Sequence, residues 1–166
     1  MADMLVRLYD LPALAPAIDR AARHGVSLRR PQVWEKALLI AWVRDTFSPG
    51  WALECEAAFT RQPAACFIAI AAAAVVGFAC HDCTRANFFG PTGVAPSERG
   101  QGVGSALVLA CLHAMRDAGY AYAIIGGVGP AEFYAKTVDA QPIAGSTPGI
   151  YDLSLVTRTS RTVPAK

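Results

Sequence analysis

The residues best suited to chemistry form a glycine-rich segment, Arg99-Gly100-Gln101-Gly102-Val103-Gly104-Ser105, between a strand-like run (88–94) and an apolar helical run (103–118). At such a turn the first N–H groups of the helix have no carbonyl partner and lie at the positive end of the helix dipole. They can bind phosphate without a metal ion or a cationic side chain, and glycine lets the backbone approach closely because it has no Cβ. The segment therefore predicts a phosphate-binding turn. The alternative is a tight strand–helix junction without a ligand.

This segment also carries a resemblance to a known family. Residues 94–104, Val-Ala-Pro-Ser-Glu-Arg-Gly-Gln-Gly-Val-Gly, resemble the acetyl-CoA motif of the GNAT acetyltransferase superfamily, Arg/Gln-x-x-Gly-x-Gly/Ala after a strand that ends in Val-x-Pro. Val75-Val76-Gly77-Phe78 is similar to the third strand of that family. The resemblance implies that the turn holds the pyrophosphate of acetyl-CoA, the expected acyl donor. It implies that the amides of Gln101, Gly102, Val103, Gly104 and Ser105 face the pyrophosphate, and that Arg99 and Gly100 lead into the turn.

The same resemblance implies roles for two further regions. The fourth family strand, here 87–94, splays from the fifth, so that Gly93 and Val94 offer backbone N–H groups to the pantetheine arm and the thioester oxygen. Tyr134, in Glu132-Phe133-Tyr134, matches the family tyrosine that protonates the departing CoA sulfur. The chain departs from the family at Gly127, where an Asn that touches CoA is common.

A base that deprotonates an attacking amine is less evident. Acidic residues are missing from the strand 87–94, where some acetyltransferases carry their base. The candidates are His81, Asp82, Glu54 and Glu56, and His81 has the ordinary pKa best suited to the task. Each is more commonly a solvated surface residue, and a chain of water molecules is a further alternative.

Other phosphate-binding classes fit the sequence poorly. A dinucleotide-binding fingerprint needs GxGxxG and an acid about 20 residues later, whereas this spacing is different and residues 120–129 contain no acid. A P-loop needs Gly-Lys followed by Ser or Thr, which does not occur.

Composition limits the class of protein. The 166 residues fit a single domain (1–166, core 4–156), and 54% hydrophobic with 17% charged residues indicates a globular chain. A net charge of +2 with scattered basic residues argues against a nucleic-acid partner. The first residues do not resemble a secretory signal, and the uncharged run 66–80 is shorter than the roughly 20 residues of a spanning helix. We therefore expect a cytoplasmic protein with no membrane partner.

Five cysteines, at positions 55, 66, 80, 83 and 111, are expected to be buried free thiols. Cys80-His81-Asp82-Cys83 has the spacing of half a zinc site, but no second such pair follows. The sequence reading is a strand end beside a turn, with no metal.

The order of elements predicts the fold class. Strands are expected at 4–9, 66–71, 75–80, 87–94 and 120–125, helices at 14–25, 31–47, 49–60, 103–118 and 130–138, and a closing hairpin at 141–144 and 150–157 before a polar tail after 158. This is an α/β order. It resembles the GNAT fold, a mixed, mostly antiparallel central sheet flanked by helices, with the fourth and fifth strands splayed.

The resulting hypothesis is an N-acyltransferase that moves an acetyl group from acetyl-CoA to a primary amine by direct attack, without a covalent enzyme intermediate. The acceptor would be a small-molecule or peptide amine, and a homodimer is compatible with the sequence. The alternative is a GNAT-like module that binds CoA or acyl-CoA without catalysis.

Overall fold

Within residues 2–150, a central sheet of seven strands organises the fold. The computed structural model describes residues 2–150 of the chain. The strands lie in the order β2-β3-β4-β5-β6-β1-β7, and every neighbouring pair is antiparallel except β5–β6, which is parallel. Their bounds are β1 Met4–Arg7, β2 Ser27–Arg29, β3 Cys66–Ala71, β4 Ala74–His81, β5 Phe88–Val94, β6 Tyr122–Ile125 and β7 Gln141–Pro142.

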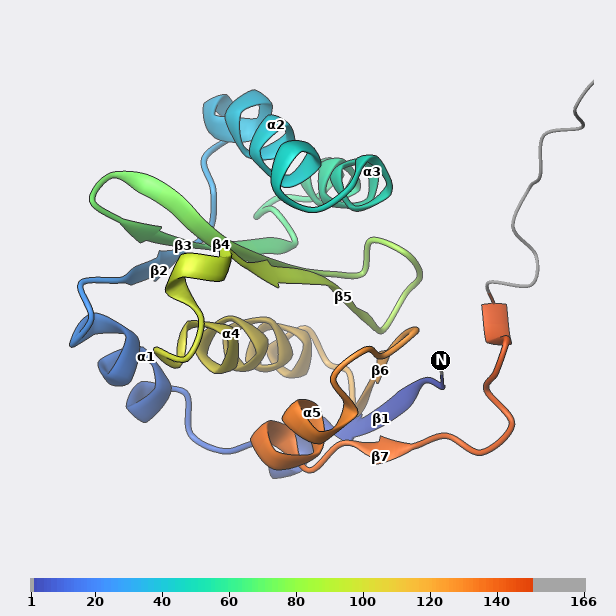
Figure 1. The fold of residues 1–166 in the computed structure, drawn as a ribbon. Coiled ribbons are helices and arrows are strands. Elements are labelled where there is room, and N and C mark those ends of the chain that lie inside the picture. Colours follow the sequence, from blue (N-terminus) through green and yellow to red (C-terminus); the bar gives the residue numbers. More distant parts are fainter. Residues whose placement is uncertain (1, 151–166) are drawn as a thin grey trace, which may run out of the picture.

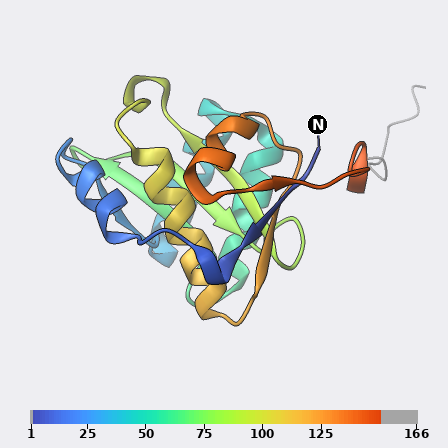
Figure 2. The same cartoon turned by 90° about the horizontal axis from the view of Figure 1, so that it is seen from below.

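Helices cover both faces of this sheet (Figure 1). α2 and α3 pack on one face above a core that includes Phe78, and α4 packs on the other face with α1 beside it. The view from below shows α4 between α1 and α5 (Figure 2). The α-helices are α1 Ala15–Ala22, α2 Lys36–Thr46, α3 Pro49–Ala57, α4 Val103–Asp117 and α5 Ala131–Val138, and the short 3₁₀ turns are η1 Leu8–Asp10, η2 Val33–Glu35, η3 Ala58–Thr60 and η4 Pro96–Glu98.

Local chemistry explains where the two helices nearest the site begin. Pro49 opens α3, and the Ser48 hydroxyl accepts a hydrogen bond from the Trp51 amide at 3.2 Å, which caps its first turn. α4 begins after Gly102, whose φ of +83° lies in the left-handed region that glycine adopts without strain. Apolar residues surround nearly the whole of α4, and nine of them are buried. The helix is therefore held between the sheet and the helices beside it.

The parallel pair β5–β6 separates after two residues. Phe88 pairs with Ile124 and Phe89 with Ile125, and β5 then continues to Val94 without pairing to β6. The separation begins at Gly90, with φ +119°, and Pro91, which has no N–H to donate. The predicted fold class, including the splayed pair, is confirmed.

Several predicted bounds differ from the structure. The first strand, β1, ends at Arg7 instead of position 9, and the first helix, α1, ends at Ala22 instead of position 25. The second helix, α2, begins at Lys36 instead of position 31, and the strand predicted at 120–125, β6, begins at Tyr122. Strand β2 was not predicted, because three residues are too few to show an alternation of apolar and polar side chains. The predicted strand 141–144 is limited to Gln141–Pro142, which pairs with β1 rather than with a hairpin partner. Residues 151–157 and the tail lie outside the described residues.

No helix among residues 2–150 combines the length and the apolar character that crossing a membrane requires.

Candidate functional site

The glycine turn lies at the N-terminus of α4, as the sequence predicts. Gly100 and Gly102 both have φ in the left-handed region, at +82° and +83°. A Cβ on Gly102 would lie 2.7 Å from Cδ of Arg20, because this α1 side chain packs across the turn. A Cβ on Gly104 would meet only ordinary contacts, with Phe133 at 3.5 Å and Val94 at 3.8 Å. The backbone therefore requires glycine at 100 and 102, whereas Gly104 keeps the space in front of α4 open.

A groove of about 730 Å³ lies over this turn and is lined by residues of α1 and α5. Three cationic side chains line it: Arg20 from α1, Arg99 before the turn and Lys136 from α5. Glu98 is an acidic group in the same lining. Free amides at a helix N-terminus with three cations around them form an environment that favours a polyanion such as a diphosphate.

A second cleft, of about 690 Å³, occupies the separation between β5 and β6. Its walls come from the unpaired half of β5, the loop 126–130, α5 and the α2–α3 region. Phe47 closes one side of the cleft. Its ring leaves room only for glycine at position 93, because a Cβ on Gly93 would lie 2.5 Å from Cζ of Phe47. The cleft is thus lined mainly by apolar and aromatic side chains.

The groove and the cleft share four lining residues, Val94, Arg99, Gly104 and Phe133, so they meet end to end. An elongated molecule anchored over the glycine turn can therefore extend into the separation between the strands. The Arg99 side chain lies at this junction, where its Nε donates a hydrogen bond to the Val94 carbonyl at 3.2 Å.

The direction of the β5 amides decides which of them face the cleft. The Ala95 amide donates to Val76 on the β4 side at 2.8 Å. Since N–H groups alternate between the two sides of a strand, the Gly93 amide also points to β4 and the Val94 amide points away from it, toward the cleft. The Val94 carbonyl also points away from β4, because it accepts its hydrogen bond from the Arg99 side chain. Of the two predicted donors, Val94 is therefore the one whose amide faces the cleft, and Gly93 provides space beside Phe47.

The structure gathers most of the predicted cofactor-binding residues around this path. Lining the groove or the cleft are Gly93, Val94, Arg99, Gly100, Gly102, Gly104 and Ser105. Gln101 and Val103 line neither, and the Val103 side chain is buried in the core under α4. Arg20, Lys136 and Phe133 also line this path and are not predicted from the sequence. One face of α5 carries Phe133, Lys136 and Thr137, which are spaced three and four residues apart. This shared face is the only local feature of the sequence that groups them.

Tyr134 lines the cleft and is 6% exposed. Its ring makes edge contacts with Phe133, at 5.0 Å between centroids, and with Phe89, at 6.2 Å. Burial raises the pKa of Tyr134 to about 12, so its hydroxyl keeps its proton at neutral pH and can donate it.

Of the four candidate bases, Glu54 alone lines the cleft. It lies on α3, and its Oε1 accepts a hydrogen bond from the Thr84 hydroxyl at 2.8 Å. Thr84 also lines the cleft. Glu56 is ion-paired with Lys36 at 2.9 Å and lines neither cavity.

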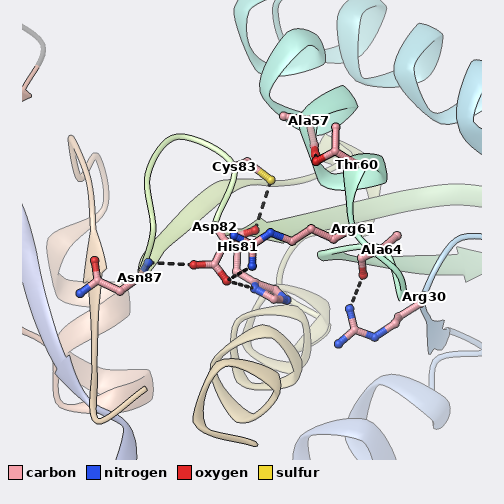
Figure 3. Close-up of polar contacts among 9 residues, drawn as sticks. All are labelled: Arg30, Ala57, Thr60, Arg61, Ala64, His81, Asp82, Cys83 and Asn87. Atoms are coloured by element: carbon pink, nitrogen blue, oxygen red, sulfur yellow. Dashed lines mark hydrogen bonds and ion pairs between the residues drawn. The ribbon is translucent and has the colours of Figure 1, made fainter. Parts of the chain in front are cut away.

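His81 and Asp82 form a buried pair that lines neither cavity (Figure 3). The His81 Nδ1 lies 3.0 Å from Asp82 Oδ2, and the Asn87 amide donates to Asp82 Oδ1 at 2.8 Å. Burial lowers the pKa of His81, and Asp82 offsets this only in part. Burial acts to raise the pKa of Asp82, but the hydrogen bonds from His81 and Asn87 outweigh it and lower that pKa. This pair stabilises the end of β4.

Gly127, where the family often carries Asn, lies in the cleft wall. Its amide donates to the buried carboxylate of Asp3 at 2.8 Å. A backbone contact from the N-terminal segment thus holds the loop 126–130 in place.

Comparison with known proteins identifies the family. The sequence model of the Acetyltransferase (GNAT) family matches residues 36–136, more than half of the chain. No curated protein matches the sequence significantly.

Three solved structures resemble the fold. A GCN5-related glucosamine N-acetyltransferase region of a fungal multi-domain GH3 beta-N-acetylglucosaminidase has a TM-score of 0.69 and 16% identity, over 86% of this chain and 19% of that chain. A GCN5-related N-acetyltransferase from Sphaerobacter thermophilus has a TM-score of 0.62 and 15% identity, over 86% and 48%. A GNAT family acetyltransferase from Brucella melitensis, in complex with acetyl-CoA, has a TM-score of 0.54 and 18% identity, over 74% and 89%.

At these identities the structural similarity shows the fold. The chain spans less than half the length of the first two proteins. The family match rests on the sequence itself and includes the glycine turn, β5 and most of α5. This protein belongs to the GNAT acetyltransferase family.

Proposed function

We propose that the protein transfers an acetyl group from acetyl-CoA to a primary amine by direct attack. The observation that carries this proposal is the continuous path from the cationic groove over the glycine turn into the cleft between β5 and β6. A GNAT acetyltransferase of similar fold was crystallised with acetyl-CoA, which supports the choice of donor.

In this proposal the pyrophosphate of acetyl-CoA binds over the turn. The first amides of α4 face it, and Arg20, Arg99 and Lys136 offset its charge. The pantetheine arm then passes the junction at Gly104 and Phe133 and lies along the unpaired half of β5. The Val94 amide donates a hydrogen bond to the donor there, and such donors stabilise charge that develops on a thioester oxygen.

The acceptor amine enters the other end of the cleft, beside Trp51 and Glu54. Glu54, directly or through one water molecule, takes a proton from the ammonium group, and the free amine attacks the thioester carbonyl. The new C–N bond forms as the C–S bond breaks, and the thiolate takes the proton of the Tyr134 hydroxyl. The aromatic walls favour an amine that carries an apolar group.

The test combines binding with turnover. Titration calorimetry of acetyl-CoA into the purified chain is expected to show binding, and incubation with acetyl-CoA and a panel of amines is expected to release free CoA thiol. The absence of binding heat at millimolar acetyl-CoA would contradict the assignment of the groove. Binding without thiol release from any amine in the panel would favour the non-catalytic CoA-binding module instead.

A further inference from the structure

Three of the five cysteines converge at one place on the α2–α3 face of the sheet, and a fourth packs against the same core cluster; none of the four lines the groove or the cleft. Cys55 comes from α3, Cys66 from the start of β3 and Cys80 from the end of β4. Their Sγ atoms all lie within 4.8 Å of one another, and all three residues are fully buried. Cys66 and Cys80 are direct partners in the β3–β4 register, so their side chains leave the sheet on the same face.

The fourth thiol belongs to Cys83, three residues after Cys80. It is half-buried and packs against the same core cluster. Its Sγ donates to the His81 carbonyl at 3.2 Å (Figure 3). The figure also shows the His81 imidazole directed toward α4, on the other side of the strand from Cys83. His81 is therefore separated from the group of thiols.

In the sequence, Cys80 and Cys83 have the spacing of half a zinc site but no second pair of ligands follows them. The fold supplies that pair, Cys55 and Cys66, from two other elements. Thiolates around tetrahedral zinc lie about 3.8 Å apart, given Zn–S bonds of about 2.3 Å. The Sγ separations among Cys55, Cys66 and Cys80, all within 4.8 Å, are within reach of small side-chain rotations, and Cys83 would give up its hydrogen bond to the His81 carbonyl to join them.

We propose that Cys55, Cys66, Cys80 and Cys83 form a structural zinc site with four thiolate ligands. Binding displaces the protons of the thiols that remain protonated and requires no oxidant or reductant. Closed four-thiolate sites of this kind stabilise a fold and leave no position for a substrate.

The position of the thiols gives the site a consequence for the cleft. Cys55 directly follows Glu54, and Cys83 directly precedes Thr84, the two residues joined by the 2.8 Å hydrogen bond in the cleft wall. One ion held by both cysteines would fix α3 to the end of β4 immediately behind that wall.

The test measures metal on the tag-free, full-length chain purified in reducing buffer without chelators. Elemental mass spectrometry is expected to find about one zinc per chain, and a strong chelator is expected to lower the melting temperature. Cys83→Ser is expected to reduce zinc occupancy severalfold. The matched control is Cys111→Ser, since Cys111 is equally buried but donates to the Ala79 carbonyl at 3.3 Å and lies outside the group; it should retain zinc.

A second measurement keeps the test independent of variant folding. Titration of the reduced, unmutated chain with Cd²⁺ is expected to produce a cadmium–thiolate ultraviolet band that saturates at one ion per chain. A metal-free purified chain that gives no such band would overturn the proposal. So would a mass two units below the reduced value, with Cys66 and Cys80 joined as a disulfide. Neither result bears on acetyl transfer, which is assayed separately.

Discussion

The Tyr134 hydroxyl is protonated at neutral pH, as an ordinary tyrosine is, and burial raises its pKa further, to about 12. We expect Tyr134→Phe to lower kcat by about 100-fold, the usual scale for loss of a general acid, while the affinity for acetyl-CoA stays unchanged. Steady-state kinetics measures kcat, and calorimetry on the same sample measures the affinity for acetyl-CoA. Tyr122→Phe, at an exposed position on β6, is the matched control and should keep full activity. An unchanged kcat in Tyr134→Phe would remove this residue from the mechanism.

The carboxylate of Glu54 is the acidic group that faces the acceptor end of the cleft. Glu54→Gln keeps an oxygen for the hydrogen bond from Thr84 but cannot take a proton. We expect kcat to fall by about 100-fold at neutral pH. The deficit should shrink as the pH rises toward the pKa of the acceptor, because more of the amine is then already deprotonated.

Glu56→Gln provides the comparison for that experiment, since Glu56 is ion-paired with Lys36 outside the cleft. It should leave kcat near the parent value at every pH. Equal losses in the two variants would indicate damage to α3 rather than removal of a base.

At the level of single residues, the sequence predicted the parts of the site that are local. The glycine turn and its helix are consecutive, so their chemistry could be inferred from spacing. Arg20 could not, because it reaches Gly102 only through the packing of α1 beside α4, about 80 residues apart in the chain. The choice among the four bases likewise depended on how α3 packs over β5.

The first turn of α4 separates two roles that glycine can have. Gly102→Ala places a Cβ in the left-handed region and against Arg20, so we expect it to destabilise the fold by about 1–2 kcal/mol. Gly104→Ala meets no close neighbour and improves helix propensity, so its melting temperature should match the parent or exceed it.

The binding test needs a larger side chain than alanine, because the family motif accepts either glycine or alanine at position 104. Gly104→Glu directs a bulky, negatively charged side chain toward Phe133 and Val94, at the junction of the groove and the cleft, and should weaken acetyl-CoA binding strongly, whereas Gly104→Ala should keep it. Thermal unfolding and calorimetry on all three variants check these outcomes. Full affinity in Gly104→Glu would place the coenzyme elsewhere.

The segment before α2 offers a pH-dependent contact. Both carboxylate oxygens of Glu35 accept from Arg29, at 2.6 and 2.7 Å, and Oε2 also accepts from the Gln32 amide at 2.7 Å. Arg29, and then the Gln32 amide, lower the pKa of Glu35 to about 2. The lowered pKa means that the contact stabilises the fold above the ordinary pKa of about 4.5 and is lost as the pH falls toward 2.

We therefore expect Glu35→Gln to be less stable than the parent at pH 7 by up to about 1 kcal/mol, a modest value because both side chains are partly exposed. The difference should disappear near pH 2. Denaturant unfolding at pH 7, 4 and 2 measures it. A difference that persists unchanged at pH 2 would show that the charge of Glu35 is not its source.

Elements were predictable where they are long and periodic. α4 and the β3–β4 hairpin follow from their apolar patterns, although the hairpin turn uses Ala72 and Ala73 in the left-handed region, at φ 47° and 63°. β2 has three residues and β7 two, too few for a pattern, and only their pairing with β3 and β1 defines them.

For the whole molecule, the joined cavities predict the order of catalytic events. The groove and the cleft can hold donor and acceptor together, and no cysteine within residues 2–150 lines either one. We therefore expect double-reciprocal plots for acetyl-CoA and amine to intersect, as in a ternary-complex mechanism. Without amine, no burst of free CoA should appear. Parallel plots with an acetylated protein in the mass spectrum would indicate a covalent intermediate instead.

The place where β5 and β6 separate also bears on how the protein avoids aggregation. Unpaired backbone groups at the rim of a sheet invite other chains to add strands. Within the part of the chain that the structure describes, the rims are formed by the very short β2 and β7, whereas the β5 peptide groups beside the cleft lie in the middle of the sheet, between the helices that cover its two faces. A slender ligand can thread into that opening and satisfy them, but another polypeptide cannot dock there edge to edge.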